Sequence, residues 1–228
     1  MTVSSINNSL LHLLQITSPS LPVGAYSYSE GLETLIEQEI IQSAQQLQQW
    51  LSNELSFGAI RLESVVCMRA FHSTQIKDWE KVHYWNYWLS ATRETEELRL
   101  QSWQMGESLL RLLRHLQPEL PLGLFDRASC CNFAIAFGVA AANWQIEAHS
   151  AVLGFLHSWT SNLVTTAVKL IPLGQTQGQK VLLELYPAIE AAATESLTLE
   201  DEELGSCSWG QAIASMEHET LYSRLFRS

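Results

Sequence analysis

The chain has 228 residues and a formal net charge of −11 at pH 7, and 46% of its residues are hydrophobic. A chain of this length can bury a substantial core without a disulfide or a structural metal, and its apolar fraction argues against wholesale disorder. The acidic balance excludes the basic surface that binding to nucleic-acid phosphates requires.

The cysteines give no sign of a disulfide framework. No Cys-x-x-Cys pair occurs among Cys67, Cys130, Cys131 and Cys207, and a bond between the two adjacent residues would be strained. We therefore expect reduced thiols and a cytoplasmic location. The first residues lack the basic and apolar regions of a signal peptide, and the longest apolar run, Phe133–Ala142, is shorter than the roughly 20 residues that span a bilayer.

Side-chain spacing predicts two long helices. Mostly apolar residues recur at alternating spacings of four and three between Leu98 and Leu116, which places them on one face of a helix that begins near Thr92. A second stripe runs from Val152 to Leu170, and that helix must end before Pro172. Candidate capping boxes at three further helix starts pair Ser27 with Glu30, Ser43 with Gln46, and Thr176 with Gln179.

The run Phe133–Ala142 is apolar on every side, which is typical of a helix in the middle of a bundle. No segment shows a convincing strand pattern. The sequence therefore predicts an all-α, single-domain helical bundle of roughly ten helices around this central helix. The acidic stretch Thr194–Ser208 is expected to be a solvated linker. It would divide an all-α domain, residues 1–208, from a C-terminal helix and partner-binding tail, residues 209–228.

The sequence carries no catalytic or metal-binding motif that we recognise. The seven histidines include no i, i+4 pair and no His-Glu-x-x-His, so no preformed zinc or nickel site is indicated. Residues 174–180 resemble a phosphate loop but lack its glycine spacing, and no Gly-x-Ser-x-Gly elbow occurs. We expect no catalytic residue, no cofactor and no tight metal site.

Two alternatives remain open at this point. An all-α enzyme could use the carboxylate cluster of Glu94, Glu96 and Glu97, although such charges beside arginines usually form a solvated helix face. A metal-storage protein would bind nickel without partners, and the histidine spacing argues against it.

The segment from Ser18 to Glu33 is unusual because prolines and Gly24 stiffen a turn just before a predicted helix. This turn would hold Tyr26 and Tyr28 in a defined geometry. Rigid aromatic residues with a polar group suit protein interfaces, but both tyrosines could equally pack inside a plain helix–helix turn.

Four blocks of this sequence resemble the UreF family of urease accessory proteins. They are Leu21–Glu33, then Arg93–Arg99 with its continuation Met105–Leu110, then Phe137–Gln179, and finally Ser215–Ser228. The blocks occur in order over nearly the whole chain. The sequence departs from the family pattern at Glu217, where a basic residue is more common, and in the acidic stretch.

The resemblance implies a non-catalytic scaffold for urease maturation. In that family UreF binds the accessory protein UreD (also called UreH), and the pair docks on apo-urease. The complex recruits the GTPase UreG, which brings nickel, and UreF modulates the GTPase cycle. The resemblance also implies a homodimer without a tight nickel site of its own. Neither nucleic acid nor a membrane is expected as a partner.

We expect the partner-binding residues in the family-like blocks and on the second long helix: Tyr26, Tyr28, Glu30, His157, His218, Glu219, Tyr222, Arg224, Leu225 and Phe226. The tail from residue 219 onward is expected to be loosely held until UreD binds. His157 is expected on an exposed polar face near the UreG-docking surface. Arg224 is expected to dock against Tyr26, joining the two ends of the chain.

Overall fold

The structure is a computed structural model that describes residues 3–120, 122 and 130–228, with side chains from residue 8 onward. The described residues form eleven α-helices and no strand, which confirms the all-α prediction. The helices are α1 Val3–Ile16, α2 Leu32–Glu37, α3 Ala44–Phe57, α4 Ala59–Gln75, α5 Trp79–Thr92, α6 Glu96–Leu116, α7 Phe133–Asn143, α8 Ala148–Leu170, α9 Gln175–Glu184, α10 Tyr186–Thr198 and α11 Trp209–His218. Two short 3-10 turns are η1 Ala25–Ser27 and η2 Asp201–Glu203.

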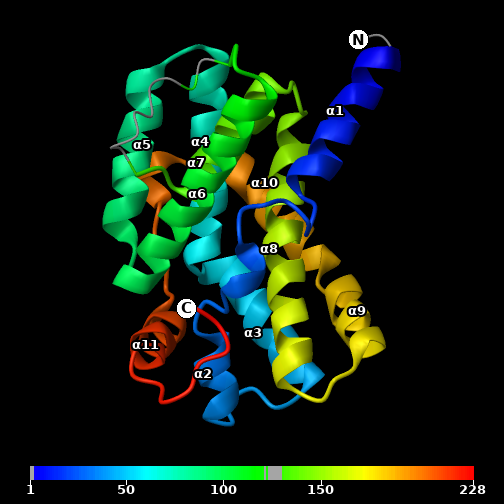
Figure 1. Ribbon diagram of the computed structural model, residues 1–228, viewed down its shortest axis with the longest axis vertical. Helices are drawn as coiled ribbons and strands as arrows, with labels where there is room; N and C mark the ends of the chain where they lie inside the picture. The colour runs from blue at the N-terminus through cyan, green and yellow to red at the C-terminus, as the bar shows by residue number, and fades with distance from the viewer. Residues whose placement is uncertain (1–2, 121, 123–129) are drawn as a thin grey trace.

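Helix α7 is the central helix that the sequence predicted. Residues 134–141 are buried, and α4, α6 and α8 surround the helix in Figure 1. Gly138 allows α4 to approach, because a Cβ atom there would lie 2.3 Å from the carbonyl oxygen of Cys67. A small residue at this crossing therefore sets the distance between the two most extensively packed helices.

The two predicted long helices are present. Helix α8 ends at Leu170, before Pro172, as expected. Helix α6 begins at Glu96, four residues later than the predicted Thr92, because the Thr95 side chain accepts a hydrogen bond from the Leu98 amide and caps the helix there.

Only one of the three candidate capping boxes starts a helix. The Ser43 hydroxyl accepts from the Gln46 amide at the start of α3. The prediction at Ser27 is wrong, because Ser27 ends η1 and its hydroxyl donates to the Gly24 carbonyl. The prediction at Thr176 is also wrong, because α9 begins at Gln175, directly after Gly174.

The C-terminal segment packs on the rest of the chain. Helix α11 lies against the short α2, and the last residues return to the turn before α2, where Figure 1 shows the C-terminus. Helix α10 extends to Thr198, so the solvated acidic stretch is shorter than predicted. Within the described part of the chain, no helix is long and apolar enough to cross a membrane.

Candidate functional site

The two tyrosines of the turn before α2 differ in their exposure to solvent. Tyr26 is 68% exposed, whereas Tyr28 is buried and donates its hydroxyl hydrogen to Gln104 Oε1 on α6. Gly24 and Gly31 bracket this turn with φ angles of 80° and 83°, which favour glycine. Tyr28 therefore packs inside the protein, whereas the Tyr26 ring is open to solvent.

The tail pairs with this same turn. The carbonyl oxygen of Ser228 accepts from the amides of Ser29 at 2.6 Å and Glu30 at 3.0 Å, and the Arg227 amide donates to the Ser27 carbonyl at 2.8 Å. Phe226 is buried. The expectation of a loosely held tail in the isolated chain is therefore wrong, because backbone hydrogen bonds and a buried ring hold residues 226–228.

A charged cluster holds the tail next to α2. The Glu33 carboxylate accepts from the amides of Leu225 at 2.7 Å and Phe226 at 3.1 Å. His218 is fully buried, with Nε2 3.1 Å from Glu33 Oε2 and Nδ1 3.1 Å from Glu97 Oε2. Each ring nitrogen of His218 therefore faces a carboxylate oxygen, and the imidazole bridges α2 and α6.

Arg224 belongs to this cluster and not to the turn. Its Nη1 atom lies 2.7 Å from Glu97 Oε1. In the part of the chain that the structure describes, no contact between Arg224 and Tyr26 is present. The predicted pairing of these two residues is therefore wrong. The guanidinium group of Arg224 binds the Glu97 carboxylate, and a charge-assisted hydrogen bond of this kind is stronger than one to a neutral group.

His157 does not stand on a fully exposed polar face. It is half-buried on α8, its ring centroid lies 6.1 Å from that of Tyr186, and burial lowers the pKa of its imidazole. Thr160, three residues further along α8, is fully buried. His157, Ser158 and Ser161 instead line a cavity.

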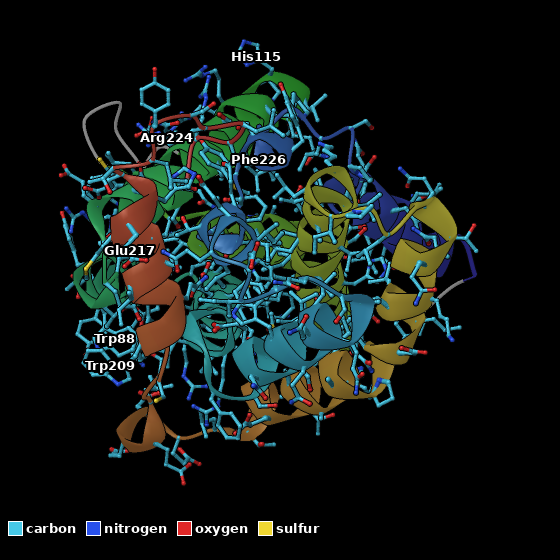
Figure 2. The ribbon with its side chains drawn as sticks, turned by 90° about the horizontal axis from the view of Figure 1, so that it is seen from below. Trp88, His115, Trp209, Glu217, Arg224 and Phe226 are labelled. Atoms are coloured by element: carbon cyan, nitrogen blue, oxygen red, sulfur yellow. The ribbon has the colours of Figure 1, made fainter. Side chains whose placement is uncertain are left out.

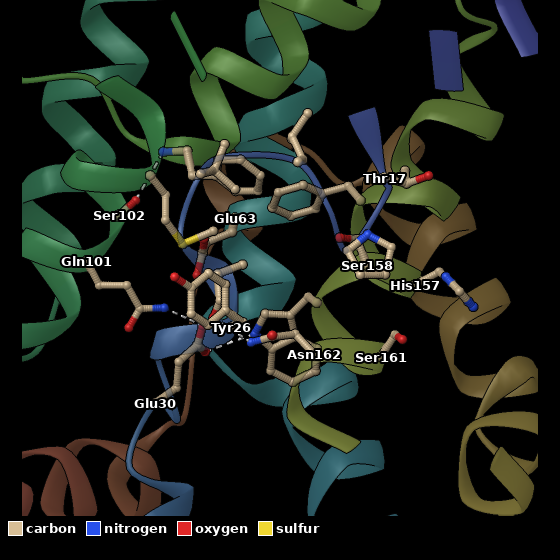
Figure 3. A pocket seen from close by; sticks show the side chains of 18 of the residues that line it. Thr17, Tyr26, Glu30, Glu63, Gln101, Ser102, His157, Ser158, Ser161 and Asn162 are labelled. Carbon is tan, nitrogen blue, oxygen red and sulfur yellow. Dashed lines mark hydrogen bonds between the residues drawn. The ribbon is translucent and has the colours of Figure 1, made fainter. Parts of the chain in front are cut away.

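This cavity has a volume of about 180 Å³ and lies between α6, α8 and the loop from α1 to η1 (Figure 3). Its polar lining includes Glu30, Glu63, Arg93, Gln101, Ser102, His157 and Asn162, and its apolar lining includes Leu98, Met105, Phe133, Phe155 and Trp159. Tyr26 contributes to the lining from the exposed turn.

Glu30 is held at the cavity by three neutral donors. Its Oε1 accepts from Gln101 Nε2 at 2.8 Å, and its Oε2 accepts from Trp159 Nε1 at 2.9 Å and from Gln211 Nε2 at 3.3 Å. Burial, together with the nearby Glu63 carboxylate, raises the pKa of Glu30. Three different helices thus converge on one carboxyl group.

Further charged groups lie behind Glu30. Arg93 and Glu63 form a buried ion pair at 2.7 Å, and the Arg93 Nε atom is buried without a hydrogen-bond partner among the described residues. Burial, with contributions from Glu30 and Glu94, raises the pKa of Glu54 to about 7. The interior beside the cavity therefore contains more carboxyl groups than cations.

Comparison with known proteins decides the family. The UreF family model matches residues 41–186. The urease accessory protein UreF of Nostoc sp. is 57% identical over 228 residues, which cover 100% of this chain and 99% of that relative. The chain belongs to the UreF family. The UreF of Microcystis aeruginosa is 55% identical over 96% of this chain and 97% of its own length. The UreF of Alcanivorax borkumensis is 40% identical over 97% of this chain and 99% of its own length.

In this UreF family member the expected partner-binding residues divide into two groups. Tyr26, Glu219, Tyr222, Arg224 and Leu225 are exposed. Tyr28, His218 and Phe226 are buried, and Glu30 and His157 are partly buried. In this structure Tyr28, His218 and Phe226 hold the turn and the tail in place.

The carboxylates proposed for the alternative enzyme do not form a common site in this UreF fold. Glu96 is exposed, Glu97 binds His218 and Arg224, and none of Glu94, Glu96 and Glu97 lines the cavity. Among the described residues no group of three or more metal-ligating side chains could hold a metal ion.

Sequence reasoning missed Glu33, Gln101 and Gln211. Glu33 holds the tail, and the two glutamines hold Glu30. Glu33 and Gln211 lie within or beside the family-like blocks, but their partners are more than 180 positions away, so no local pattern identifies them.

Proposed function

We propose that this chain is a non-catalytic docking subunit that binds UreD (UreH) and recruits the GTPase UreG to apo-urease. In this proposal the complex inserts nickel into the urease metallocentre, and this chain modulates the GTPase cycle without a resident metal or cofactor. The proposal includes a cytoplasmic location. The proposed partners are those that the family resemblance implies. The observation that supports a docking role is an exposed apolar surface on the C-terminal segment.

That surface is apolar, and the buried contacts of Glu33 and His218 hold its backbone in place. Trp209 is 74% exposed, Ile213 and Met216 are exposed on the same helix, and Tyr222 and Leu225 are exposed on the tail. Exposed apolar residues gathered on one segment mark a protein interaction site more often than a solvent face. Figure 2 shows Trp88 of α5 projecting from the same side of the molecule as Trp209.

The test is capture of purified UreD by the full chain. Tyr222→Ala with Leu225→Ala should weaken UreD binding at least tenfold, because aromatic and aliphatic anchors dominate interface energetics. Neither side chain makes an internal hydrogen bond in the described structure, so the melting temperature should stay constant. Ile76→Ala, an exposed apolar change at the end of α4, is the matched control. Unweakened UreD capture by the double variant would refute the docking surface.

UreG recruitment is proposed for the α8 surface around His157. The rim there is polar and uncharged, with Ser158, Ser161 and Thr165, which suits a transient interface. Ser161→Glu should weaken UreG capture while UreD capture is retained. If Ser161→Glu captures UreG as well as the wild type does, UreG does not dock on this surface of α8.

We also propose a homodimer. Leu10, Leu11 and Leu14 are exposed on one side of α1, and a second copy would cover such a row. Light scattering should give a dimer mass for the wild type and a monomer mass for Leu11→Glu. A wild-type monomer at all concentrations contradicts this part of the proposal.

A further inference from the structure

The cavity beside Glu30 is sized for one side chain. Pockets for drug-sized ligands usually span about 300–1,000 Å³, and this cavity has about 180 Å³. It opens beside the exposed ring of Tyr26, on the loop that precedes α2. A single group of amino-acid size is therefore the ligand that fits its dimensions.

The charge of the cavity favours a cation. Arg93 also attracts Glu30, but it forms its ion pair with Glu63, and the three hydrogen-bond donors to Glu30 are all neutral. A carboxylate has about four acceptor positions, so the three bonds to Glu30 leave one position on Oε1. Burial disfavours an unpaired carboxylate, and a bound cation would relieve that cost.

The walls suit the rest of a basic side chain. Phe133, Phe155 and Trp159 line the cavity, and aromatic faces attract ammonium and guanidinium groups. Met105 and Leu98 offer apolar surface to an aliphatic stem. A lysine or arginine side chain combines these two parts, an aliphatic stem and a cationic head.

We infer that this cavity receives one lysine or arginine side chain from a partner protein that docks on α8, with the Glu30 carboxylate binding its cationic head. The rim favours a protein over a free amine, because an exposed tyrosine among uncharged polar side chains is typical of an interface. The inference rests on the proposed function only in that the partner belongs to the urease-maturation assembly.

The first test uses no partner. The full chain, labelled with ¹⁵N, is titrated with N-acetylarginine amide, its neutral analogue N-acetylcitrulline amide and the anionic N-acetylglutamate amide. The indole N–H signal of Trp159, identified with Trp159→Phe, reports binding. The arginine compound should bind at least tenfold more tightly than the citrulline compound. Equal affinities, or tighter binding of the glutamate compound, would overturn the inference.

Two variants locate the preference. Glu30→Gln keeps the shape of the side chain and should abolish the difference between the two compounds. Glu107→Gln, an exposed change on α6, removes the same charge and should retain the difference. Because Glu30→Gln removes a buried group, Ser158→Phe provides a second test. It keeps Glu30 but narrows the cavity, and it should eliminate binding of the arginine compound. Retention of the preference in Glu30→Gln, or of binding in Ser158→Phe, contradicts the site.

Competition distinguishes the source of the cation. N-acetylarginine amide should displace UreG captured by the wild-type chain, and N-acetylcitrulline amide should not. If wild-type chain captures UreG and the arginine compound fails to displace it, the docking subunit stands and the inferred side-chain site does not. If the chain prefers the arginine compound but does not capture UreG, the inferred side-chain site stands and the proposed recruitment of UreG does not.

Discussion

The Nε2 atom of His218 lies 3.1 Å from Oε2 of Glu33, although 185 positions separate the two residues in the chain. The Glu33 carboxylate also accepts hydrogen bonds from the backbone amides of Leu225 and Phe226. The last turn of α11 and the tail are therefore fixed to α2 through one carboxylate. Because His218 is fully buried, this contact is shielded from solvent.

Removing the imidazole should release the tail. His218→Ala removes the hydrogen-bonding partner that the buried Glu33 and the partly buried Glu97 share, and removing one partner from a buried pair costs about 3–5 kcal/mol. We expect a loss of unfolding free energy of about 3 kcal/mol in denaturant titrations. The amides of Leu225 and Phe226 should also lose protection in hydrogen exchange. His72→Ala, at an exposed position of α4, is the control. Unchanged protection of the two tail amides would disprove the role of His218.

Glu54 should make stability depend on pH. Its pKa is about 7 in the folded chain, against 4.5 for an unperturbed glutamate side chain. The folded state therefore binds the extra proton between these two values, so the free energy of unfolding falls as pH rises from about 4.5 to 7. The loss at higher pH is about 3 kcal/mol relative to a neutral side chain.

Glu54→Gln should remove this loss. The variant should be more stable than the wild type at pH 8, and the difference should shrink toward pH 5, as measured by urea titration at each pH. Glu107→Gln is exposed and should follow the wild-type pH profile. A constant difference between Glu54→Gln and wild type across this range would exclude the raised pKa as the cause.

The helix crossing at Gly138 should not tolerate a methyl group. An added Cβ would lie 2.3 Å from a backbone oxygen of α4, which cannot rotate away. Overpacking of this kind costs about 1–3 kcal/mol. Gly138→Ala should therefore lower the melting temperature. Gly210→Ala provides the matched control, because no atom lies within 4 Å of its Cβ position and alanine favours the helix. Equal melting temperatures for the two variants would contradict the close crossing.

Arg224 should couple to Glu97 and not to Tyr26. The pair is partly exposed, so Arg224→Ala should cost less than about 1 kcal/mol of stability. In double-mutant cycles, Arg224→Ala with Tyr26→Ala should be additive, whereas Arg224→Ala with Glu97→Gln should show an interaction energy. Non-additivity with Tyr26 would restore the pairing that the sequence suggested.

Local patterns predicted the helices better than the site. The stripes of α6 and α8 and the apolar run of α7 arise from neighbouring residues, so their periodicity is visible in the sequence. Ser27 and Glu30 have the spacing of a capping box, but Gly31 follows with a positive φ angle, and α2 starts only after it. Glu30 then belongs to the cavity and not to a helix cap.

The tail could not be judged by counting its apolar residues. Its attachment depends on amides that bind Glu33 and on a carbonyl that binds Ser29 and Glu30. These backbone groups are present in every sequence, so only the folded chain shows which of them are used. The prediction for Arg224 was likewise wrong, because its carboxylate partner, Glu97, lies in α6, 127 positions away along the chain.

Gln211 connects α11 to the cavity through a single hydrogen bond to Glu30 Oε2. A cation that draws this carboxylate toward the cavity must change the strength of that bond, and a protein that displaces α11 must change the donors around Glu30. Coupling between two binding events is reciprocal in free energy. A protein bound at the C-terminal segment and a group bound in the cavity should therefore change each other's affinity by the same factor.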